Sequence, residues 1–199
     1  MIDVNKIEGK SEQELLNSIN VDEVFYKVEE IPGKLFKGKK YELTYINKED
    51  VKQFIKEYII NIALAMDIKV NTEIRLVDNK SYNVMLISES NPILIGKEGK
   101  TLNSIQLLLH QALNNATGFN IRINVDAAGY KMNKEKRLER EVKRIAKEVL
   151  NTKIDAKLDP MNSYSRRLVH EIVSSFKNLT TESFGEEPQR YVVISYKED

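Results

Sequence analysis

Two glycines separated by two residues and followed by a lysine form the segment best suited to hold a ligand, Gly96-Lys97-Glu98-Gly99-Lys100. Glycine has no Cβ atom, so a ligand backbone can approach the main chain closely at Gly96 and Gly99. The apolar spacing from Thr101 onward predicts a helix, and the free N–H groups of a helix N-terminus favour phosphate. Lys97 and Lys100 add positive charge. The pattern predicts a loop that grips about four nucleotides of a single strand.

Apolar residues on both sides of the loop complete the predicted site. Ile93, Ile95, Leu102 and Ile105 are expected to line a groove for unstacked bases. The predicted contact set is Gly96, Lys97, Glu98, Gly99, Lys100, Thr101, Ile95 and Leu102. The alternative is a turn between two helices that needs two glycines, with lysines that are only solvated. A mononucleotide-binding loop is rejected, because it needs a glycine at the position of Leu94.

A second spacing of interest joins Arg166 and His170, four residues apart in a stretch whose apolar pattern predicts a helix. Residues at this spacing share one helix face, so a guanidinium and an imidazole are expected to point outward side by side. They form a predicted contact for phosphate or a base edge, together with Arg167 and Arg190. The alternative is structural: His170 hydrogen-bonds a nearby backbone and holds a sheet.

The sequence lacks the residue combinations that catalysis needs. The chain has no cysteine and two histidines, and His110 lies on the helix after the glycine loop with no partner nearby in sequence. We expect His110 to be a partly exposed helix residue. No cluster of His, Asp and Glu has metal-ligand spacing, and no nucleophile stands beside a base. The sequence therefore predicts a protein that is not an enzyme, with no cofactor and no metal site.

A long predicted helix over residues 133–151 carries a row of basic residues, namely Lys136, Arg137, Arg140, Lys143, Arg144 and Lys147. Four glutamates are interleaved with this row: Glu135, Glu139, Glu141 and Glu148. Salt pairing at i,i+4 on a solvated helix explains the row slightly better than an RNA track does. Both interpretations stay open on the sequence alone.

The elements that position these residues predict an α+β protein of three small units, over residues 1–47, 48–128 and 129–199. In the first unit, Ser11 is the expected N-cap of a short helix and Glu14 stands at the capping-box position. That helix is expected at 11–16, between strands at 2–4, 24–28 and 41–46.

The second unit is expected to follow the order α-β-β-α-α-β. The elements are predicted, in chain order, at 51–66, 70–76, 82–87, 91–95, 101–115 and 119–125. A tight turn at 78–80 joins the two strands of a hairpin. The helix over 101–115 is expected to bury Leu102, Ile105, Leu108, Leu109 and Ala112. The third unit is predicted to pack helices at 133–151 and 162–176 on a small sheet of strands at 179–183 and 191–195.

Composition and charge place the chain among folded proteins. Its 41% apolar and 31% charged residues do not fit a disordered chain. Residues 127–199 have 15 basic and 12 acidic side chains, a net of +3, which is compatible with phosphate contacts; residues 1–47 have 7 and 9, a net of −2. The N-terminal unit is therefore predicted to dock a protein.

No apolar run approaches the roughly 18 residues of a membrane span, and residues 1–10 form no signal peptide. A cytoplasmic location is therefore expected.

The segment Leu94-Ile95-Gly96-Lys97-Glu98-Gly99-Lys100-Thr101-Leu102, in its predicted α-β-β-α-α-β unit, resembles the core of a prokaryotic, type II KH domain. The stretch from Asp159 to His170 resembles an R-three-H domain, the family named for its Arg-x-x-x-His signature, and so does the stretch from Ser183 to Ile194. Arg166 and His170 match the signature pair. These resemblances imply binding of single-stranded nucleic acid.

A KH domain followed directly by an R-three-H domain, behind a small α+β unit, resembles the bacterial Jag (SpoIIIJ-associated) family over residues 49–199. The first unit resembles the Jag N-terminal domain more loosely, in Ile7-Glu8-Gly9-Lys10-Ser11 and in the basic, glycine-containing loop at 32–38. Two features depart from the family pattern. The N-terminal helix is short, and the long charged linker that many members carry before the KH domain is missing.

The family resemblance implies a cytoplasmic protein that binds single-stranded RNA or single-stranded DNA. It implies a small KH protein as hetero-partner, or a second copy in a homodimer. Family members are tied to cell elongation and envelope synthesis, and the gene often neighbours that of a membrane-protein insertase. The expected function is post-transcriptional regulation by the KH and R-three-H modules together. The alternative is an adaptor for an insertase or cell-wall machinery, peripheral to the membrane and without an integral membrane segment, in which RNA binding is secondary.

Overall fold

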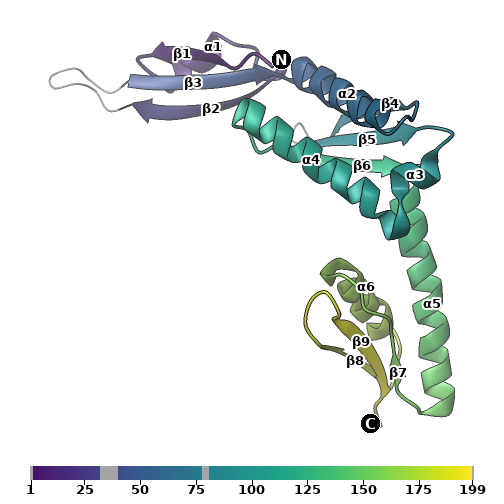
Figure 1. The fold of residues 1–199 in the computed structure, drawn as a ribbon. Coiled ribbons are helices and arrows are strands. Elements are labelled where there is room, and N and C mark those ends of the chain that lie inside the picture. Colours follow the sequence, from purple (N-terminus) through teal and green to yellow (C-terminus); the bar gives the residue numbers. More distant parts are fainter. Residues whose placement is uncertain (1, 32–39, 78–80, 199) are drawn as a thin grey trace. The chain divides into compact units, whose positions relative to one another are not determined.

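The computed structural model describes residues 2–31, 40–77 and 81–198, and the chain divides into two compact units, Met1–Ala128 and Gly129–Asp199. The described residues form three three-stranded sheets, two in the first unit and one in the second (Figure 1). The predicted α+β class with three small sheets is confirmed. Residue 47, the end of the first predicted unit, lies inside the first compact unit.

The N-terminal sheet is antiparallel and has the order β1-β3-β2, from β1 (Asn5–Gly9), β2 (Val24–Ile31) and β3 (Lys40–Asn47). The predicted strand at 2–4 is wrong, because pairing with β3 starts at Asn5, opposite Tyr45. Ile2 is buried all the same, at 6% exposure. An apolar side chain can be buried from an irregular segment, so apolar character alone does not define a strand. The predicted loop at 32–38 lies outside the described residues.

Helix α1 (Glu12–Asn17) begins where the capping pattern predicted. The Ser11 hydroxyl accepts a hydrogen bond from the Glu14 N–H at 3.2 Å. The Glu14 carboxylate in turn accepts one from the Lys10 N–H at 3.0 Å, one residue before the N-cap. These bonds satisfy backbone donors that the start of a helix leaves unpaired. With six residues, α1 is as short as the sequence predicted.

The second sheet is built by elements in the predicted α-β-β-α-α-β order: α2 (Lys48–Ala65), β4 (Asn71–Val77), β5 (Ser81–Ile87), α3 (Asn91–Ile95), α4 (Lys100–Thr117) and β6 (Arg122–Ala127). The strand order is β4-β5-β6; β4 and β5 are antiparallel, and β5 and β6 are parallel. Parallel neighbours need a crossover connection, and α3 and α4 supply it. The predicted turn at 78–80 lies outside the described residues.

Helices α2 and α4 lie side by side and cover one face of this sheet (Figure 1). Alternate residues of β5 are buried against them, and α4 buries Leu102, Ile105, Leu109 and Leu113. The sequence placed Leu108 on this buried face, but Leu108 is 48% exposed. Ile105, Leu109 and Leu113 follow one another in steps of four along the core-facing stripe. Leu108 falls outside that series, because it lies about 100° around the helix from Leu109.

The first two sheets are joined without a linker, because Asn47 is both the last residue of β3 and the N-cap of α2. The Lys48 ammonium donates to the Asp22 carbonyl at 2.7 Å. The buried Tyr82 hydroxyl donates to the Lys48 carbonyl at 2.7 Å, and its ring meets Phe25 edge-on with centroids 6.1 Å apart. Burial raises the pKa of the Tyr82 hydroxyl, which keeps it protonated as a donor.

The second unit packs α5 (Tyr130–Thr152) and α6 (Ser163–Ser174) against an antiparallel sheet of β7 (Ala156–Lys157), β8 (Leu179–Phe184) and β9 (Tyr191–Tyr196), in the order β7-β9-β8. Its core is the cluster Val142, Val149, Leu158, Val169, Val173, Val192 and Ile194. The sequence predicted both helices and two of these strands. It did not predict β7, because a strand of two residues has no detectable alternation.

Among the described residues, no helix combines the length and the apolar character needed to cross a membrane.

Candidate nucleic-acid interface

The glycine loop lies between α3 and α4 and contains one 3-10 turn, η1 (Lys97–Gly99). Gly96 has φ +69° and Gly99 has φ +82°, in the left-handed region that favours glycine. A Cβ atom on Gly96 would also collide with the Thr101 side chain. Gly96 is therefore needed for the turn itself.

The charged side chains of the loop are exposed to solvent, whereas its glycines are more buried. Lys97, Glu98 and Lys100 are exposed, whereas Gly99 is buried. Ile95, Gly96 and Thr101 are half-buried. The Gly96 N–H donates to the Pro92 carbonyl at 2.9 Å, which anchors the loop to α3. The two lysines thus stand beside a fixed backbone turn.

Helix α4 starts at this loop with no side-chain cap and no acidic residue in its first turn, within the described residues. The N–H groups of the first turn and the positive end of the helix dipole therefore favour an anion at this point. The exposed Lys97 and Lys100, on either side of Glu98, add positive charge at the same point.

The predicted apolar groove is only partly present. Ile93 is 56% exposed, but Leu102 and Ile105 are 1% and 4% exposed. Both belong to the stripe of α4 that packs on the sheet, because they share the helix face of Leu109. Leu102 therefore supports the loop from below and offers no surface to a base, and the apolar surface next to the loop comes from α3.

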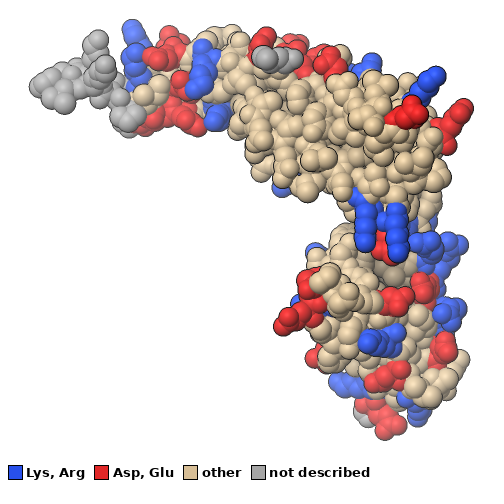
Figure 2. Space-filling view, viewed as in Figure 1, with Lys and Arg blue, Asp and Glu red and all other residues tan. Residues whose placement is uncertain are grey.

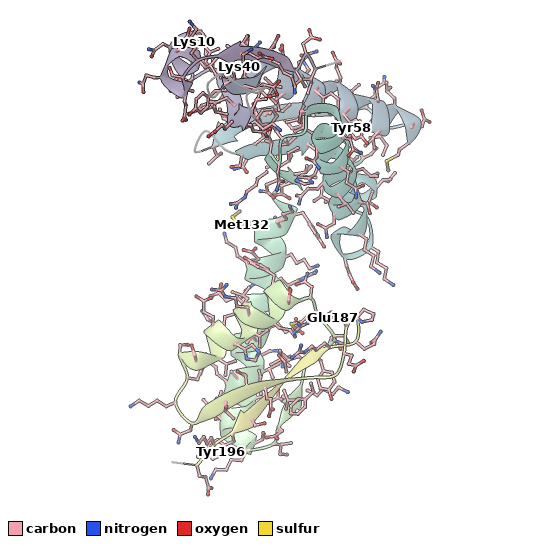
Figure 3. All side chains as sticks on the ribbon, turned by 90° about the vertical axis from the view of Figure 1, so that its left-hand side faces the viewer. Lys10, Lys40, Tyr58, Met132, Glu187 and Tyr196 are labelled. Carbon is pink, nitrogen blue, oxygen red and sulfur yellow. The ribbon has the colours of Figure 1, made fainter. Side chains whose placement is uncertain are left out.

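The expectation that Arg166 points outward is wrong. Arg166 is 7% exposed, and its Nη1 donates to the Met161 carbonyl at 2.7 Å and pairs with Glu187 Oε1 at 2.8 Å. Glu187 lies in the segment between β8 and β9 (Figure 3). The guanidinium therefore ties the start of α6 to that segment, a contact between residues far apart in sequence.

His170 joins α6 to β8. Its Nδ1 is 2.7 Å from the Thr181 hydroxyl and its Nε2 is 3.0 Å from the Ser183 hydroxyl. This agrees with the structural alternative, except that the partners are side-chain hydroxyls and not backbone. Thr181 and Ser183 were missed, although their spacing of two in a predicted strand places both on one face.

The two remaining arginines of the predicted set, Arg167 and Arg190, are exposed. Tyr164, one turn before Arg167, is 62% exposed, and its hydroxyl donates to Glu135 Oε1 at 2.9 Å. That hydrogen bond raises the pKa of Tyr164.

On the KH side, His110 is half-buried as predicted, with Nε2 3.0 Å from Asn120 Oδ1.

Among the described residues, no group of three or more His, Asp or Glu side chains is placed to hold a metal ion.

The α-β-β-α-α-β unit with its Gly-x-x-Gly turn, and the helix-on-sheet unit with its Arg-x-x-x-His pair, define a protein that combines a KH domain with an R-three-H domain. Family models agree with this class. The model described as "KhpA/KhpB, KH domain" matches residues 52–125, and the model of the R-three-H domain matches residues 136–196.

Similar proteins point to one family. The chain is 35% identical over 153 residues to the RNA-binding protein KhpB of Clostridium symbiosum, covering 76% of this chain and 69% of that protein. It is 33% identical over 154 residues to the RNA-binding protein KhpB of Bacillus subtilis (strain 168), covering 76% and 74%. The chain belongs to the KhpB (Jag) family.

Proposed function

We propose that this chain binds single-stranded RNA through its KH loop and its R-three-H domain, and does no chemistry on the strand. The main support for this proposal is the loop at 96–100, which has two glycines at positive φ, two exposed lysines and an uncapped helix start. Each of these features favours a phosphate backbone. The relatives named RNA-binding protein KhpB support RNA as the ligand.

In this proposal the KH loop holds the backbone. Lys97 and Lys100 contact phosphates, and Ile93 and Ile95 contact the bases. Gly96 allows the strand to approach, whereas the buried Gly99 supplies the left-handed N-cap of α4. Thr101 and Glu98 shape the turn, and Leu102 holds it from the core side. Single-stranded DNA fits the same contacts, so a comparison of RNA with DNA of one sequence belongs to the experiment.

In the R-three-H domain we propose a division of roles. Arg167 and Arg190 are exposed and contact phosphate. Arg166 and His170 position the surrounding segments, since Nη1 of Arg166 and both ring nitrogens of His170 already have partners. The signature pair then acts on nucleic acid through the surface that it holds in place.

Binding of a short single-stranded RNA, measured by fluorescence anisotropy, tests the KH loop. Lys97→Gln/Lys100→Gln should weaken binding by about tenfold and lower the slope of log K against log salt by about 1.4, from about 0.7 per lost phosphate contact. The matched control is Lys56→Gln/Lys69→Gln, two exposed lysines of the same unit, with little change expected. Equal affinity for both variants would exclude the loop as the site, and so would unchanged binding by Gly96→Asp/Gly99→Asp.

The regulatory role is part of the proposal. We propose that the protein acts on transcripts linked to cell elongation and envelope synthesis, with the N-terminal unit docking a protein. Crosslinking in cells followed by sequencing of bound RNA tests this. Enrichment of such transcripts, lost in Lys97→Gln/Lys100→Gln, is the expected result; an enrichment that survives in the variant argues for an adaptor with secondary RNA binding.

We also propose a small KH protein as partner of the KH domain. Leu107 and Leu108 of α4 are 57% and 48% exposed, next to each other on a helix whose other leucines are buried. An exposed apolar pair of this kind fits a protein contact. Light scattering of the mixed proteins should show a complex that Leu108→Glu abolishes. A complex of twice the 23.0 kDa mass of this chain, formed without the second protein, would instead indicate a homodimer.

A further inference from the structure

Six cations lie on one side of α5, opposite its core face; they are called the α5 stripe and are Lys136, Arg137, Arg140, Lys143, Arg144 and Lys147. At 3.6 residues per turn they occupy about 120° of the helix circumference. The buried residues Val142, Ala146 and Val149 face the other way. The four glutamates of the helix fall outside this sector, at its borders or beyond. In Figure 2, Lys and Arg side chains lie along the edge of the second unit where α5 runs, with Asp and Glu side chains between them.

Salt pairing accounts for two of the six cations. Lys143 pairs with Glu139 at 2.6 Å and Arg144 with Glu148 at 3.3 Å, both at i,i+4. Within the described residues, Lys136, Arg137, Arg140 and Lys147 make no ion pair. Arg140 donates through Nε to the Lys136 carbonyl at 3.3 Å, which lays its guanidinium along the helix. The i,i+4 pairing expected from the sequence therefore leaves four of the six cations without an ion pair in the described part of the chain.

This arrangement opposes helix stability in the free protein. Lys136 and Arg140, Arg140 and Arg144, and Lys143 and Lys147 are like charges at i,i+4, a spacing at which like charges destabilise a helix. A bound polyanion would relieve that repulsion. A shallow hollow beside the first half of the stripe is lined by Lys136, Arg137, Arg140 and Lys143, with Asn133 and Tyr130 at its edge.

We infer that the α5 stripe binds the phosphate backbone of RNA, as a site separate from the KH loop; this rests on the proposed function, which supplies RNA as the ligand. The stripe is about 16 Å long at 1.5 Å per residue, and it carries no aromatic side chain for stacking. Its contacts are therefore to phosphate and independent of base sequence.

The composition of the stripe favours RNA over other anionic partners. A protein interface needs an apolar centre, and the stripe sector has none. A helix that lies on a membrane inserts its apolar face, but the apolar face of α5 is the core of its own unit. A row of cations, four of the six without an ion pair among the described residues, suits a ligand whose only regular feature is repeated negative charge.

The test compares two triple variants of the full chain with the same change in charge. The first is Lys136→Gln/Arg137→Gln/Arg140→Gln. The control is Lys153→Gln/Lys177→Gln/Lys197→Gln, three exposed lysines of the same unit. Glutamine is a good helix former, so α5 should persist, and circular dichroism checks it. A third variant, Lys136→Arg/Arg137→Lys/Arg140→Lys, keeps the charge and should bind as the unmodified protein does.

The affinity of each variant for a single-stranded RNA is measured by fluorescence anisotropy between about 50 and 200 mM salt. The stripe variant should bind about tenfold more weakly, and its salt slope should fall by about 2, from about 0.7 for each of three contacts. The control should change little. If the unmodified protein binds RNA and the two triple variants bind equally, the stripe is not a site and the proposed function stands. If the unmodified protein binds no RNA, the proposed function itself fails.

Discussion

At the scale of single residues, neighbouring arginines have different tasks. Arg166 is buried with two partners, and Arg167 is exposed. Sequence spacing alone treats them as equivalent members of a basic cluster. Their difference arises because helical geometry turns Arg166 toward the core face of Val169 and Arg167 away from it.

This difference predicts opposite effects of two similar substitutions. Arg166→Met should lower stability by about 1–3 kcal/mol, because the Met161 carbonyl loses its donor inside the protein. Arg167→Met should change stability by less than about 0.5 kcal/mol and weaken RNA binding. Thermal melting and RNA anisotropy on both variants check this; a stable Arg166→Met protein would contradict the positioning role.

The hydrogen bond of Tyr164 leads to a prediction about its titration with pH. Its hydrogen bond to Glu135 raises its pKa, since the carboxylate favours the protonated phenol. The contribution to stability is present below the ordinary tyrosine pKa and is lost as pH rises through the raised value. NMR titration of labelled tyrosine should show Tyr164 deprotonating at lower pH in Glu135→Gln. An unchanged midpoint in that variant would assign the shift to another cause.

At the scale of elements, the turn between α3 and α4 depends on one glycine for two reasons. Gly96 has positive φ, and its missing Cβ leaves room for Thr101. Gly118, at the end of α4, has nearly the same φ of +70° but open space around it. Substitution at Gly118 therefore measures the cost of backbone strain alone, whereas substitution at Gly96 adds the cost of the steric clash with Thr101.

Gly118→Ala should cost about 1–2 kcal/mol, because alanine is disfavoured in the left-handed region. Gly96→Ala should cost more than this, because the added methyl group also displaces Thr101. Urea unfolding of both variants measures the difference. Equal losses would mean that Thr101 moves aside freely and that the turn tolerates a side chain at position 96.

Element order and the glycine loop could be predicted from sequence, because helical and strand periodicities are local. The partners of Arg166 and His170 could not, since Glu187, Thr181 and Ser183 come from segments more than ten residues away. Leu108 was placed wrongly for a related reason: a run of three leucines at 107–109 satisfies more than one choice of buried face. Only packing against the sheet decides between them.

At the scale of the whole molecule, two nucleic-acid modules on one chain predict a dependence on RNA length. When one strand reaches both modules, the second contact forms at high effective concentration and raises affinity by about 10²- to 10⁴-fold. Lys97→Gln/Lys100→Gln, which weakens the KH contact about tenfold, should lower this gain by about the same factor. A gain with length that is the same in the variant would mean that the modules bind independently.

The junction between β3 and α2 bears on how the N-terminal unit can be studied. Because Asn47 belongs to both elements and Phe25 packs on Tyr82, cutting the chain at this point would uncover an aromatic side chain of the next sheet. A shortened protein that starts at residue 48 would therefore be a damaged KH domain as well as one without its neighbour. Point substitutions on the outer strand faces, such as Tyr26→Ser at 43% exposure, assign a role to this unit without exposing what it shields.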